Sequence, residues 1–549
     1  MAQLDSSTVA TATVAQHLSD HNQLHKKANY VFDVMDYGVT GDGSTDDTAT
    51  IQAAVDAAEV LGGEVFFPLA ASSYLMGTVT VGTSDGVTLN GGGSAVLTLT
   101  GASAGFRLVG TVSNCTVKGF IAAGDGTSDT GQAFLSNATG QTLKNIKALH
   151  NVITNIQLGI ALTSESGGLI ENIEYAHNHV ETLQGTAGGQ GYGLFLAGAN
   201  DTSIYGNIHH NTIIDASRHS IYVSRGDDVI VAHNLIKDHR STDKDASTRS
   251  AIEVSRGSRR AVIGNVFENT ADGCIGIGPD DTASTQDILI ANNILGPMAN
   301  TVAQIHIGSS DPSAEGAISR VKVIGNIFTS GGSGGTNIEM WSGTNHTISD
   351  NLFVADGANS IVALAYDETA GTSTYSDEWE INNNRFVLAN SAAAFRSNPP
   401  FTTAGVTVRF RGNVVTPGEA MFGQNAVLNG PIYHIVDNPQ TGIIWDTGKE
   451  GIETSIVAFG DGDGTPSVLG GHVFKTANSA GKSITNFDQG NEGQVITVIV
   501  DDTNTTFTHG GSGLLFLNGA ANFVATSKGT LTLVFDGTSW HEIGRSDLT

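Results

Sequence analysis

The sequence predicts an all-β fold, a right-handed parallel β-helix with an N-terminal capping helix, followed by a small C-terminal β-sandwich-like domain. The first observation is a repeat of about 29 residues, in which an asparagine precedes a short apolar run. The second is the content of each repeat, where segments such as IYVS and IEVS are rich in Ile and Val and too short for helices. Repeats of this period bury their apolar faces only against neighbouring repeats, as a solenoid does. The repeated asparagines are Asn151, Asn178, Asn211, Asn234, Asn265, Asn293, Asn326, Asn351, Asn384 and Asn413.

We expect these asparagines at the corners of successive coils. Asn tolerates the left-handed backbone conformation that a tight corner needs. Stacked Asn side chains, about 4.8 Å apart, can also hydrogen-bond along the stack. The resulting rod would present long, ladder-like faces that suit polymeric ligands.

Composition limits the partners of the chain. The formal net charge of −28 argues against nucleic acid and anionic membrane surfaces. No segment approaches the roughly 18 apolar residues of a membrane span, so membrane insertion is not expected. The N-terminus lacks the basic-then-apolar pattern of a signal peptide. Cys115 and Cys274 lie many coils apart and are expected as separate thiols.

The rhythm of the sequence divides the chain into four parts. Residues 1–29 are polar, contain a short expected helix and suit an attachment segment. Residues 30–418 hold the repeats of the β-helix, and residues 419–465 form a connector rich in Gly and Asn. Residues 466–549 contain alternating strand segments (ITVIV, GLLFL and LTLVF) separated by turn signals, which predict a compact β domain.

A capped helix is expected at the start of the β-helix. Its cap lies in the run Ser44-Thr45-Asp46-Asp47, and Gly62-Gly63 ends it. Such a helix would cover the open end of the solenoid, whose first coil otherwise exposes apolar side chains and unpaired strand edges. Its apolar face is formed by Ile51, Ala54, Val55 and Ala58.

The same region resembles a known superfamily. The residues that carry the resemblance are Phe32-Asp33-Val34, Asp36-Tyr37-Gly38, Gly41-Asp42-Gly43, Asp46-Asp47-Thr48 and Ile51-Gln52-Ala53-Ala54. This run is similar to the opening of pectate-lyase-like β-helix proteins, which include many phage tailspike depolymerases. The superfamily also holds hydrolases, epimerases and adhesins, so the resemblance implies the fold more strongly than the chemistry.

Both ends of the chain resemble phage tail proteins. The segment HLSDHNQLH near the N-terminus is similar to N-terminal segments of phage minor tail proteins, and the stretch LTLVFDGTSW resembles a β domain at the ends of phage tail proteins. The resemblance implies a homotrimer in the virion tail, attached to tail or baseplate proteins through its N-terminus. Its partner would be a bacterial surface polysaccharide, and its C-terminal domain would serve trimerisation or carbohydrate binding.

A cationic island interrupts this acidic chain. Nine of the 26 Lys and Arg residues fall between residues 218 and 260. Within the island two segments repeat almost letter for letter, SRHSIYVSRG and TRSAIEVSRG. Stacked one coil apart, about 4.8 Å, and alternating in side-chain direction, they place Tyr222 beside Glu253 and Arg218 beside Arg249 on the outer face. The other expected members of this column and its corner are Phe195, Gly276, His306, Glu339, Arg225 and Arg256.

Two stacked guanidinium groups repel each other, so Arg218 and Arg249 favour an anion that bridges them, such as the carboxylate of an acidic sugar. The alternative is a set of structural ion pairs with local acids. Those acids are Asp227, Asp228, Asp238, Asp243, Asp245 and Glu253.

A uronate bound by the island suggests cleavage by β-elimination, in which a base removes the proton next to a neutralised carboxylate. Tyr222 or His219 is the candidate base, although His219 could instead be a corner or core histidine with satisfied hydrogen bonds. The predicted catalytic residues are His219, Tyr222, Arg249 and Glu253. The predicted substrate-binding residues are Arg218, Arg225, Arg256, Asp227, Asp228, His306 and Glu339.

Hydrolysis is the competing chemistry and requires two carboxyl groups about 5–9.5 Å apart. Glu253 is the best outward carboxylate, and the pairs Asp227-Asp228 and Asp280-Asp281 resemble the aspartates of β-helix polygalacturonases, although the surrounding motif differs. A fibre that grips the glycan without cleaving it is a third hypothesis, and a structural tail component without a glycan ligand is a fourth.

No metal or cofactor is expected. The histidines that precede four of the repeated asparagines, at positions 150, 177, 210 and 233, are spaced by coils, whereas a metal needs converging ligands. They are interpreted as structural corner residues. Trp341 at the end of an outer strand could stack on a sugar ring, or it could equally pack against a loop or a neighbouring subunit.

Overall fold

The computed structural model describes two compact units, the first within residues 30–436 and the second within residues 456–547. The ranges described are 30–101, 104–124, 132–164, 167–183, 185, 191–198, 203–240, 250–278, 285–298, 303–308, 318–329, 336–340, 344–355, 364–367, 378–388, 395–398, 407–415, 432–436, 456–469, 472–510, 514–524 and 528–547.

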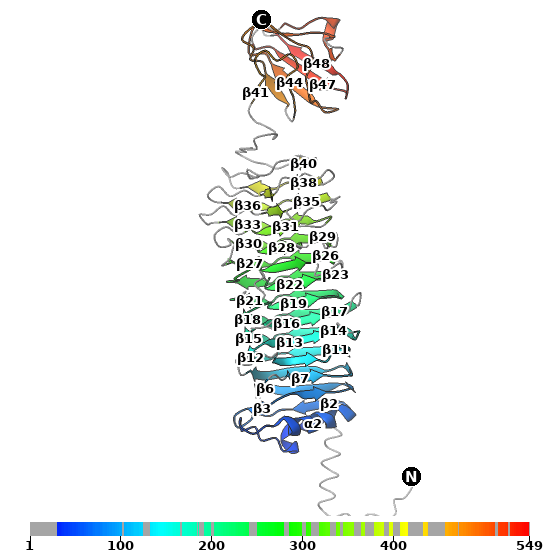
Figure 1. The fold of residues 1–549 in the computed structure, drawn as a ribbon, viewed down its shortest axis with the longest axis vertical. Coiled ribbons are helices and arrows are strands. Elements are labelled where there is room, and N and C mark those ends of the chain that lie inside the picture. The colour runs from blue at the N-terminus through cyan, green and yellow to red at the C-terminus, as the bar shows by residue number, and fades with distance from the viewer. Residues whose placement is uncertain are drawn as a thin grey trace, which may run out of the picture. The chain divides into compact units, whose positions relative to one another are not determined.

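The first unit is a parallel β-helix, which confirms the predicted fold. Its strands stack coil upon coil into three parallel ladders, so that each strand pairs with its equivalents in the coils before and after it (Figure 1). Strands β6 (Val87–Leu99) and β9 (Thr116–Ala123) run around the corner between the first two ladders.

Ladder 1 contains the longer strands. It consists of β1 (Val31–Asp33), β2 (Gly63–Phe66), β5 (Ser84–Asp85), β8 (Thr111–Ser113), β11 (Thr142–Leu149), β14 (Leu169–Ala176), β17 (Ser203–His209), β20 (Asp227–Ala232), β23 (Gly257–Ile263), β26 (Thr285–Ala291), β29 (Ile318–Ile324), β32 (Thr347–Ser349), β35 (Glu378–Asn382), β38 (Thr407–Arg411) and β40 (Ile432–Val436).

Ladder 2 follows ladder 1 in every coil. It consists of β3 (Tyr74–Met76), β12 (Val152–Ile156), β15 (His179–Leu183), β18 (Thr212–Ala216), β21 (Leu235–Lys237), β24 (Val266–Glu268), β27 (Ile294–Leu295), β30 (Ile327–Phe328), β33 (Leu352–Ala355), β36 (Arg385–Leu388) and β39 (Val414–Val415).

Ladder 3 is a separate 12-stranded sheet. It consists of β4 (Val79–Val81), β7 (Ala104–Leu108), β10 (Ala133–Asn137), β13 (Leu158–Thr163), β16 (Tyr192–Ala197), β19 (Ile221–Ser224), β22 (Ile252–Ser255), β25 (Ile275–Gly278), β28 (Ile305–Ile307), β31 (Ile338–Met340), β34 (Leu364–Asp367) and β37 (Phe395–Asn398).

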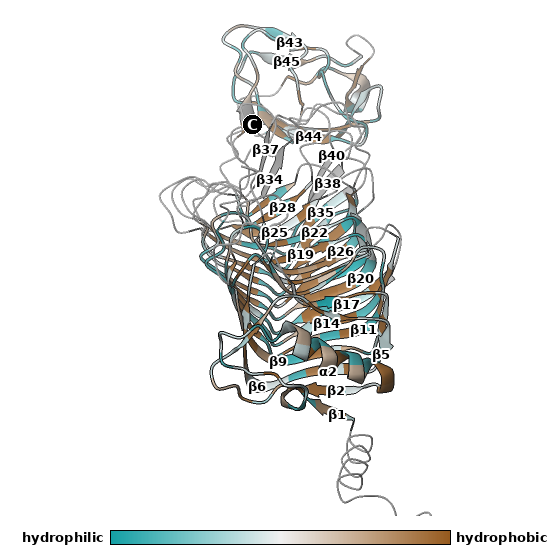
Figure 2. Ribbon diagram, turned by 60° about the horizontal axis from the view of Figure 1, so that its bottom comes forward, coloured by the Kyte–Doolittle hydropathy of each residue, from teal (hydrophilic) through white to brown (hydrophobic). Residues whose placement is uncertain are grey.

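The apolar core runs through the middle of the coils. Strand residues alternate between the core and the outside, and hydrophobic and hydrophilic colours alternate along the strands in Figure 2. In β19, Ile221 and Val223 are fully buried, and they stack on Ile252 and Val254 of the next coil. Parallel ladders covered by neighbouring coils explain why these runs are so rich in β-branched residues.

An internal ladder of asparagines lines the corner between ladders 1 and 2. Each side-chain amide donates to the side-chain oxygen of the asparagine one coil on, as from Asn234 to Asn265 at 2.9 Å, and also to a backbone carbonyl. All ten repeated asparagines are buried and belong to this chain of hydrogen bonds, which confirms the predicted stacking.

The left-handed residue at this corner, however, is not the asparagine. The prediction that Asn adopts the left-handed conformation is wrong, because the positive φ belongs to the residue before it, as at His210 (φ 54) and Gly264 (φ 66). The physical reason is that the left-handed residue points outward, which lets the following Asn turn its amide into the core.

The helix α2 (Thr48–Leu61) covers the N-terminal end of the β-helix (Figure 1). Its predicted apolar face is fully buried. The cap differs from the expectation. Asp47 occupies the N-cap position, but its carboxylate accepts hydrogen bonds from the backbone amides of Thr40 and Gly41. Asp46 instead accepts a hydrogen bond from the Thr48 backbone amide at 3.0 Å. Backbone hydrogen bonds from Thr45 and Ser44 hold the pKa of Asp42 well below its usual range.

The C-terminal end of the β-helix lies further along the chain than the sequence predicts. Strand β40 (Ile432–Val436) pairs in parallel with β38, so coiling continues into the expected connector. The sheet of the second unit starts at β41 (Val457–Ala458), before the expected boundary.

The second unit is a β domain with its own core. A six-stranded sheet contains β41, β42 (Val473–Lys475), β44 (Val495–Ile499), β47 (Thr530–Phe535), β48 (Trp540–Ser546) and β46 (Leu515–Phe516), and a two-stranded sheet pairs β43 (Lys482–Ile484) with β45 (Thr505–Phe507). Trp540 is fully buried in its core and donates its indole N–H to the Phe487 carbonyl.

Two further expectations concern the described residues. Cys115 and Cys274 are both buried free thiols, as predicted, and burial raises the pKa of each to about 12. None of the helices in the described part of the chain has the length and apolarity to cross a membrane.

Candidate functional site

The outer face of ladder 3 carries the predicted column of side chains. Strand pairing places Tyr222 opposite Glu253, Glu253 opposite Gly276, and His306 opposite both Gly276 and Glu339. The predicted register is therefore confirmed from Phe195 to Glu339. Tyr222 and Glu253 are half-buried, whereas the inward residues on either side are fully buried.

Four rings form an aromatic cluster at one end of this column, Tyr192, Phe195, His219 and Tyr222. Phe195 and Tyr222 stack face to face, with ring centroids 5.2 Å apart and planes 8° from parallel. Tyr192 lies 5.5 Å from Tyr222 and 5.3 Å from Phe195. Three of the rings are half-buried, and His219 is buried. Partly exposed aromatic rings of this kind offer flat apolar surfaces to a sugar ring.

Arg218 adds a cation to the aromatic cluster. Its guanidinium carbon lies 5.1 Å from the centroid of the Tyr192 ring, within the range of a cation–π interaction. The Arg218 guanidinium therefore places a positive charge at the aromatic cluster, with its Nε and Nη1 atoms buried in the protein. The stacking partner expected for it, Arg249, lies outside the described residues.

His219 is the buried ring of the aromatic cluster. Only 3% of it is exposed, its Nδ1 lies 2.6 Å from the Ser250 carbonyl, and its ring stacks 5.1 Å from that of Tyr222. These contacts favour the structural alternative for His219, which supports the Tyr222 ring from behind. Its role as a base stays a prediction.

Glu253 reaches toward the next coil, which has glycines at the matching positions. A Cβ at Gly276 would lie 2.0 Å from one Glu253 carboxylate oxygen, and a Cβ at Gly278 would lie 3.2 Å from the other. The carboxylate therefore occupies the space that a side chain at Gly276 would fill. Two coils beyond Glu253, His306 Nδ1 lies 3.4 Å from Glu339 Oε2, so this expected pair is in contact.

The corner after β19 and β22 is built on a buried arginine. Arg225 and Arg256 occupy equivalent left-handed positions, with φ of 54° and 53°, as their expected pairing requires. Arg260 lies underneath, 2% exposed, and donates to the backbone carbonyls of Gly226 and Ser255. Burial lowers the pKa of Arg260 to about 10. This member of the cationic island is thus part of the corner and is not available to a ligand.

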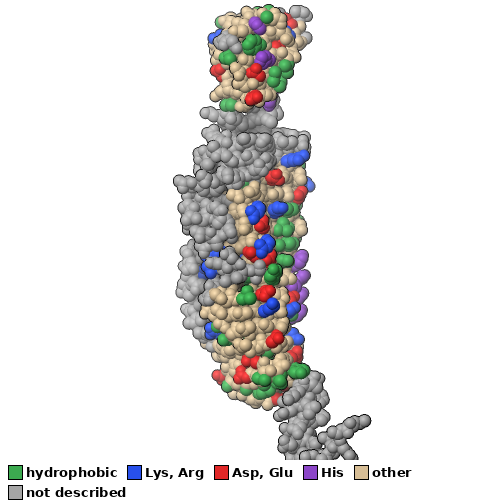
Figure 3. All heavy atoms as spheres, turned by 90° about the vertical axis from the view of Figure 1, so that its right-hand side faces the viewer, with side chains coloured by type: hydrophobic (Ala, Val, Ile, Leu, Met, Phe, Trp, Pro, Cys, Tyr) green, Lys and Arg blue, Asp and Glu red, His purple; other side chains and the backbone are tan. Residues whose placement is uncertain are grey.

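Asp227 and Asp228 lie on ladder 1, away from the column on ladder 3. Arg259 binds both, with its Nε 2.7 Å from Asp228 Oδ1 and its terminal nitrogen 3.0 Å from Asp227 Oδ2. Asp287 and Arg320 continue the same outer row, with Arg320 Nε 2.6 Å from Asp287 Oδ1. Acidic and basic residues therefore alternate over four coils, in the order Asp228, Arg259, Asp287 and Arg320. Figure 3 shows acidic and basic side chains beside one another on this face. These contacts favour the structural ion pairs that the sequence left open, and a role for the two aspartates in substrate binding stays a prediction.

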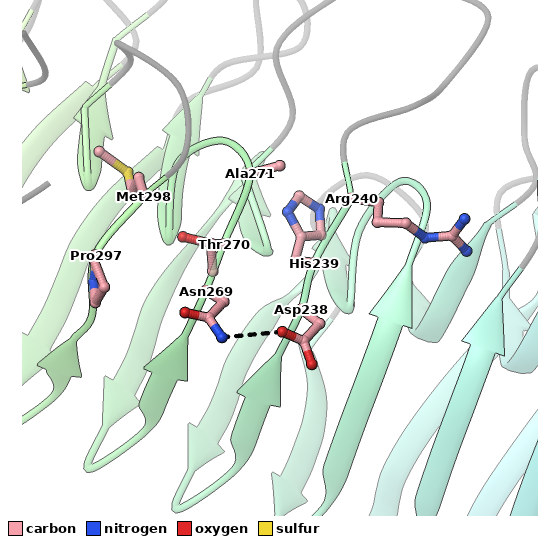
Figure 4. Close-up of a pocket in the computed structure, with 8 residues that line it drawn as sticks. All are labelled: Asp238, His239, Arg240, Asn269, Thr270, Ala271, Pro297 and Met298. Carbon is pink, nitrogen blue, oxygen red and sulfur yellow. Dashed lines mark hydrogen bonds between the residues drawn. The ribbon is translucent and has the colours of Figure 1, made fainter. Parts of the chain in front are cut away.

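A shallow pocket opens at the turns that follow the ladder 2 strands β21, β24 and β27, beside the backbone of Arg218. Its volume is about 370 Å³, and it is lined by residues from three successive coils (Figure 4). Asp238 accepts a hydrogen bond from Asn269 across it at 3.2 Å. His239 at its back is 1% exposed, hydrogen-bonds to the Arg218 carbonyl, and has its pKa lowered by burial. The remaining lining residues are Arg240, Thr270, Ala271, Pro297 and Met298.

Sequence reasoning missed Tyr192 and His239. Tyr192 and Phe195 both face outward although they are three positions apart, because the two residues between them, Gly193 and Leu194, are both buried. Simple alternation would place Tyr192 inward, and its glycine neighbour is the one signal of the irregularity. Trp341 and the pair Asp280-Asp281 lie outside the described residues.

Two protein families match parts of the chain. Residues 31–278 match the pectate-lyase-like family described as rhamnogalacturonase A/epimerase. Residues 464–541 match the phage depolymerase C-terminal β-sandwich domain. Among curated proteins no sequence matches significantly.

Solved structures with a similar fold come from several sources. The catalytic unit of a GH87 α-1,3-glucanase from Streptomyces thermodiastaticus is 17% identical over 76% of this chain and 69% of its own, with a TM-score of 0.44. The A-module of the mannuronan C-5 epimerase AlgE6 from Azotobacter vinelandii is 17% identical to this chain. The match covers 75% of this chain and 99% of the A-module, with a TM-score of 0.43. A tailspike protein mutant of E. coli bacteriophage HK620 in complex with a pentasaccharide is 12% identical to this chain. The match covers 89% of this chain and 81% of the tailspike chain, with a TM-score of 0.47.

Proposed function

We propose that this chain, which carries a pectate-lyase-like domain and a phage depolymerase C-terminal domain, is a phage tail protein that binds and cleaves a bacterial surface polysaccharide. The observation that carries the proposal is the aromatic cluster on ladder 3, with Arg218 over Tyr192 and Glu253 one coil beyond Tyr222. The protein would act outside the cell, as a homotrimer attached to the tail through its N-terminal segment.

The site suits an acidic polymer. Sugar rings stack on aromatic side chains, and Arg218 beside those rings offers a charge-assisted hydrogen bond to a uronate. The column from Phe195 to Glu339 follows the direction in which coils stack, so successive sugars would lie along the ladder. Arg225 and Arg256 at the far end of β19 and β22 would hold a second acidic group.

β-Elimination is the reaction that the site supports best. Arg218 would neutralise the uronate carboxylate. The deprotonated Tyr222 oxygen would remove the neighbouring proton, and the hydroxyl so formed would give that proton to the leaving oxygen as the C–O bond breaks and the C=C bond forms. Hydrolysis has less support, because Arg259 engages Asp227 and Asp228 on ladder 1. Glu339 stands three coils from Glu253, roughly 14 Å at the backbone, which exceeds the separation that paired carboxylates use.

The experiment uses a panel of acidic polysaccharides and records both chain length and ultraviolet absorbance. A lyase shortens the polymer and creates a conjugated double bond that absorbs, whereas a hydrolase shortens it without absorbance. We expect Tyr222→Phe to lower the cleavage rate by about 10²–10³-fold with little loss of binding, because only the proton-transferring hydroxyl is removed. Arg218→Ala should weaken binding of the same polymer.

Tyr205→Phe is the matched control. Tyr205 is an exposed tyrosine on ladder 1, and we expect its loss to leave cleavage unchanged. If the polymer becomes shorter without a gain in ultraviolet absorbance, the enzyme is a hydrolase and not a lyase. Glu253→Gln would then be the variant to test. Tight binding without shortening, for every polymer in the panel, would contradict the enzymatic proposal and favour a glycan-binding fibre.

A further inference from the structure

A row of histidines lies outside the asparagine ladder, at the corner between ladders 1 and 2. His150, His177, His210 and His233 come from four successive coils, and their rings lie 4.8, 5.2 and 5.3 Å from one another in turn. Histidine side chains follow one another along one edge of the face seen in Figure 3. The buried asparagines behind them fix the spacing between coils, so the positions of the rings are set by the core.

One coil departs from this row because it has a second histidine. His209, the last residue of β17, pairs with Ala176 in the coil before and with Ala232 in the coil after. Its ring stands nearly perpendicular to its neighbours, at 83° to His177 and 88° to His210. Its Nδ1 lies 2.9 Å from the Nδ1 of His210.

We propose that His177, His209 and His210 bind a divalent transition metal, with Zn²⁺ as the first candidate. One ring nitrogen from each of the three lies within 4.8 Å of the others, so small rotations of exposed rings bring them to a common ion. Imidazole nitrogens are preferred ligands of Zn²⁺, at about 2.0–2.1 Å, and three of them leave a fourth position for water. From the sequence, the corner histidines are interpreted as structural because a metal needs converging ligands, and His209 supplies a ring nitrogen that converges with those of His177 and His210.

A carboxylate orients His209 for this purpose. Glu174 Oε1 lies 3.3 Å from His209 Nε2, and the other Glu174 oxygen lies 2.7 Å from Lys147 Nζ. A proton on Nε2 that is held by the carboxylate leaves the Nδ1 lone pair free to face His210. A carboxylate behind a ligating histidine is the usual support of a zinc ligand, because it fixes the tautomer and makes the nitrogen more basic.

The metal would join two neighbouring coils from outside. His177 precedes β15, whereas His209 ends β17 and His210 follows it in the next coil. His177 and His210 are exposed, so the site opens to solvent and is separate from the aromatic cluster on ladder 3. Its expected effect is therefore on the stability of these coils and not on glycan cleavage.

The test is a calorimetric titration of the full chain, without a polyhistidine tag and stripped with a chelator, with Zn²⁺ at pH 7.5. We expect one ion per chain and a melting temperature that rises with Zn²⁺ and falls back with chelator. His209→Gln should weaken Zn²⁺ binding at least tenfold, and Glu174→Gln by about 10–100-fold. Ni²⁺ and Cu²⁺ should compete for the same site.

His150→Gln and His233→Gln are the matched controls, since both residues stack in the row, on His177 and His210 respectively, but neither has a histidine next to it in the sequence. They should bind Zn²⁺ as the wild type does, and circular dichroism of metal-free variants should match the wild type. Absence of saturable binding below about 1 mM, unchanged binding by His209→Gln, or an equal loss in His233→Gln would overturn the proposal.

Discussion

At the scale of the residue, three arginines of one cationic island have three different environments. Arg260 is buried and bound to backbone carbonyls, Arg259 is bound to two aspartates, and Arg218 lies over an aromatic ring. A count of positive charge along the sequence gives these residues equal weight. Burial and partners separate them: the corner backbone binds Arg260, two aspartates bind Arg259, and Arg218 places its charge beside the aromatic cluster.

His239 makes the stability of the β-helix depend on pH. Burial lowers its pKa below the ordinary value of 6.5, so below that pH the unfolded chain binds a proton that the folded chain does not. Stability should therefore fall as the pH falls from about 6.5, by up to about 1.4 kcal/mol per pH unit. In thermal unfolding between pH 7.5 and 5.5, His239→Gln should show a smaller loss than the wild type.

His150→Gln serves as the comparison, because His150 is exposed on the corner row. This variant should lose stability with falling pH as the wild type does. If His239→Gln keeps the full slope of the wild type, the pH dependence arises elsewhere and the buried neutral histidine does not explain it.

The sequence predicts the outward column well and its flanks poorly. Alternation along a strand is a local rule, so it correctly places Tyr222 beside Glu253 and Ile221 beside Ile252. The rule does not predict the position of Tyr192, because two consecutive buried residues shift the alternation within β16. It also does not predict the contact between Arg259 and Asp228, because that prediction would need the outward-facing residues of two neighbouring coils of ladder 1 to be known.

At the scale of the element, the asparagine ladder is the main polar feature of the core. Within the ladder a buried amide such as that of Asn265 accepts from the coil before and donates to the coil after, and the last one, Asn413, donates to the Ile381 carbonyl. The repeat in the sequence is sufficient to predict this stack. It is not sufficient to tell which residue of the turn is left-handed, because histidine, glycine, aspartate and asparagine all precede the ladder residue.

Asn265→Asp tests the ladder with almost no change of shape. The new carboxylate would still accept from Asn234, but it would face the Val231 carbonyl and the Asn293 oxygen, which now receive hydrogen bonds at 3.0 Å. A fully buried charge against two acceptors should lower the free energy of unfolding by about 3–5 kcal/mol at pH 7. Chemical unfolding measures the loss, which should shrink at pH 4 as the carboxyl group regains a proton.

Asn145→Asp is the control for that substitution. Asn145 also donates to an asparagine of the neighbouring coil, Asn114, at 2.7 Å, but it lies on the exposed row of ladder 1. Because water can solvate the new charge, we expect a loss below about 1 kcal/mol. Equal losses in the two variants would mean that burial does not determine how much the asparagine ladder contributes to the free energy of unfolding.

At the scale of the whole molecule, the chain combines two ways of building a core. In the β-helix each coil is covered by its neighbours, so stability is spread along the stack and the end must be covered by α2. The second unit instead gathers its apolar side chains around Trp540 in a closed core. A change of rhythm in the sequence predicts this division. It places the end of the β-helix before β40 and the start of the second unit after β41, because turn-rich coils and a turn-rich connector have similar compositions.

A closed core predicts that residues 456–549 fold as an independent fragment. Trp540 is the only tryptophan of this fragment and is fully buried, so its fluorescence reports the state of the core.

Gly490 gives the sharpest test, because a Cβ there would lie 2.5 Å from the Trp540 ring. Gly490→Ala should lower the free energy of unfolding by about 1–3 kcal/mol, since the rigid indole has to move. Gly481→Ala, whose Cβ would meet nothing within 4 Å, should leave it nearly unchanged. A fragment without a cooperative transition, or equal melting of the two variants, would show that this core depends on the rest of the chain.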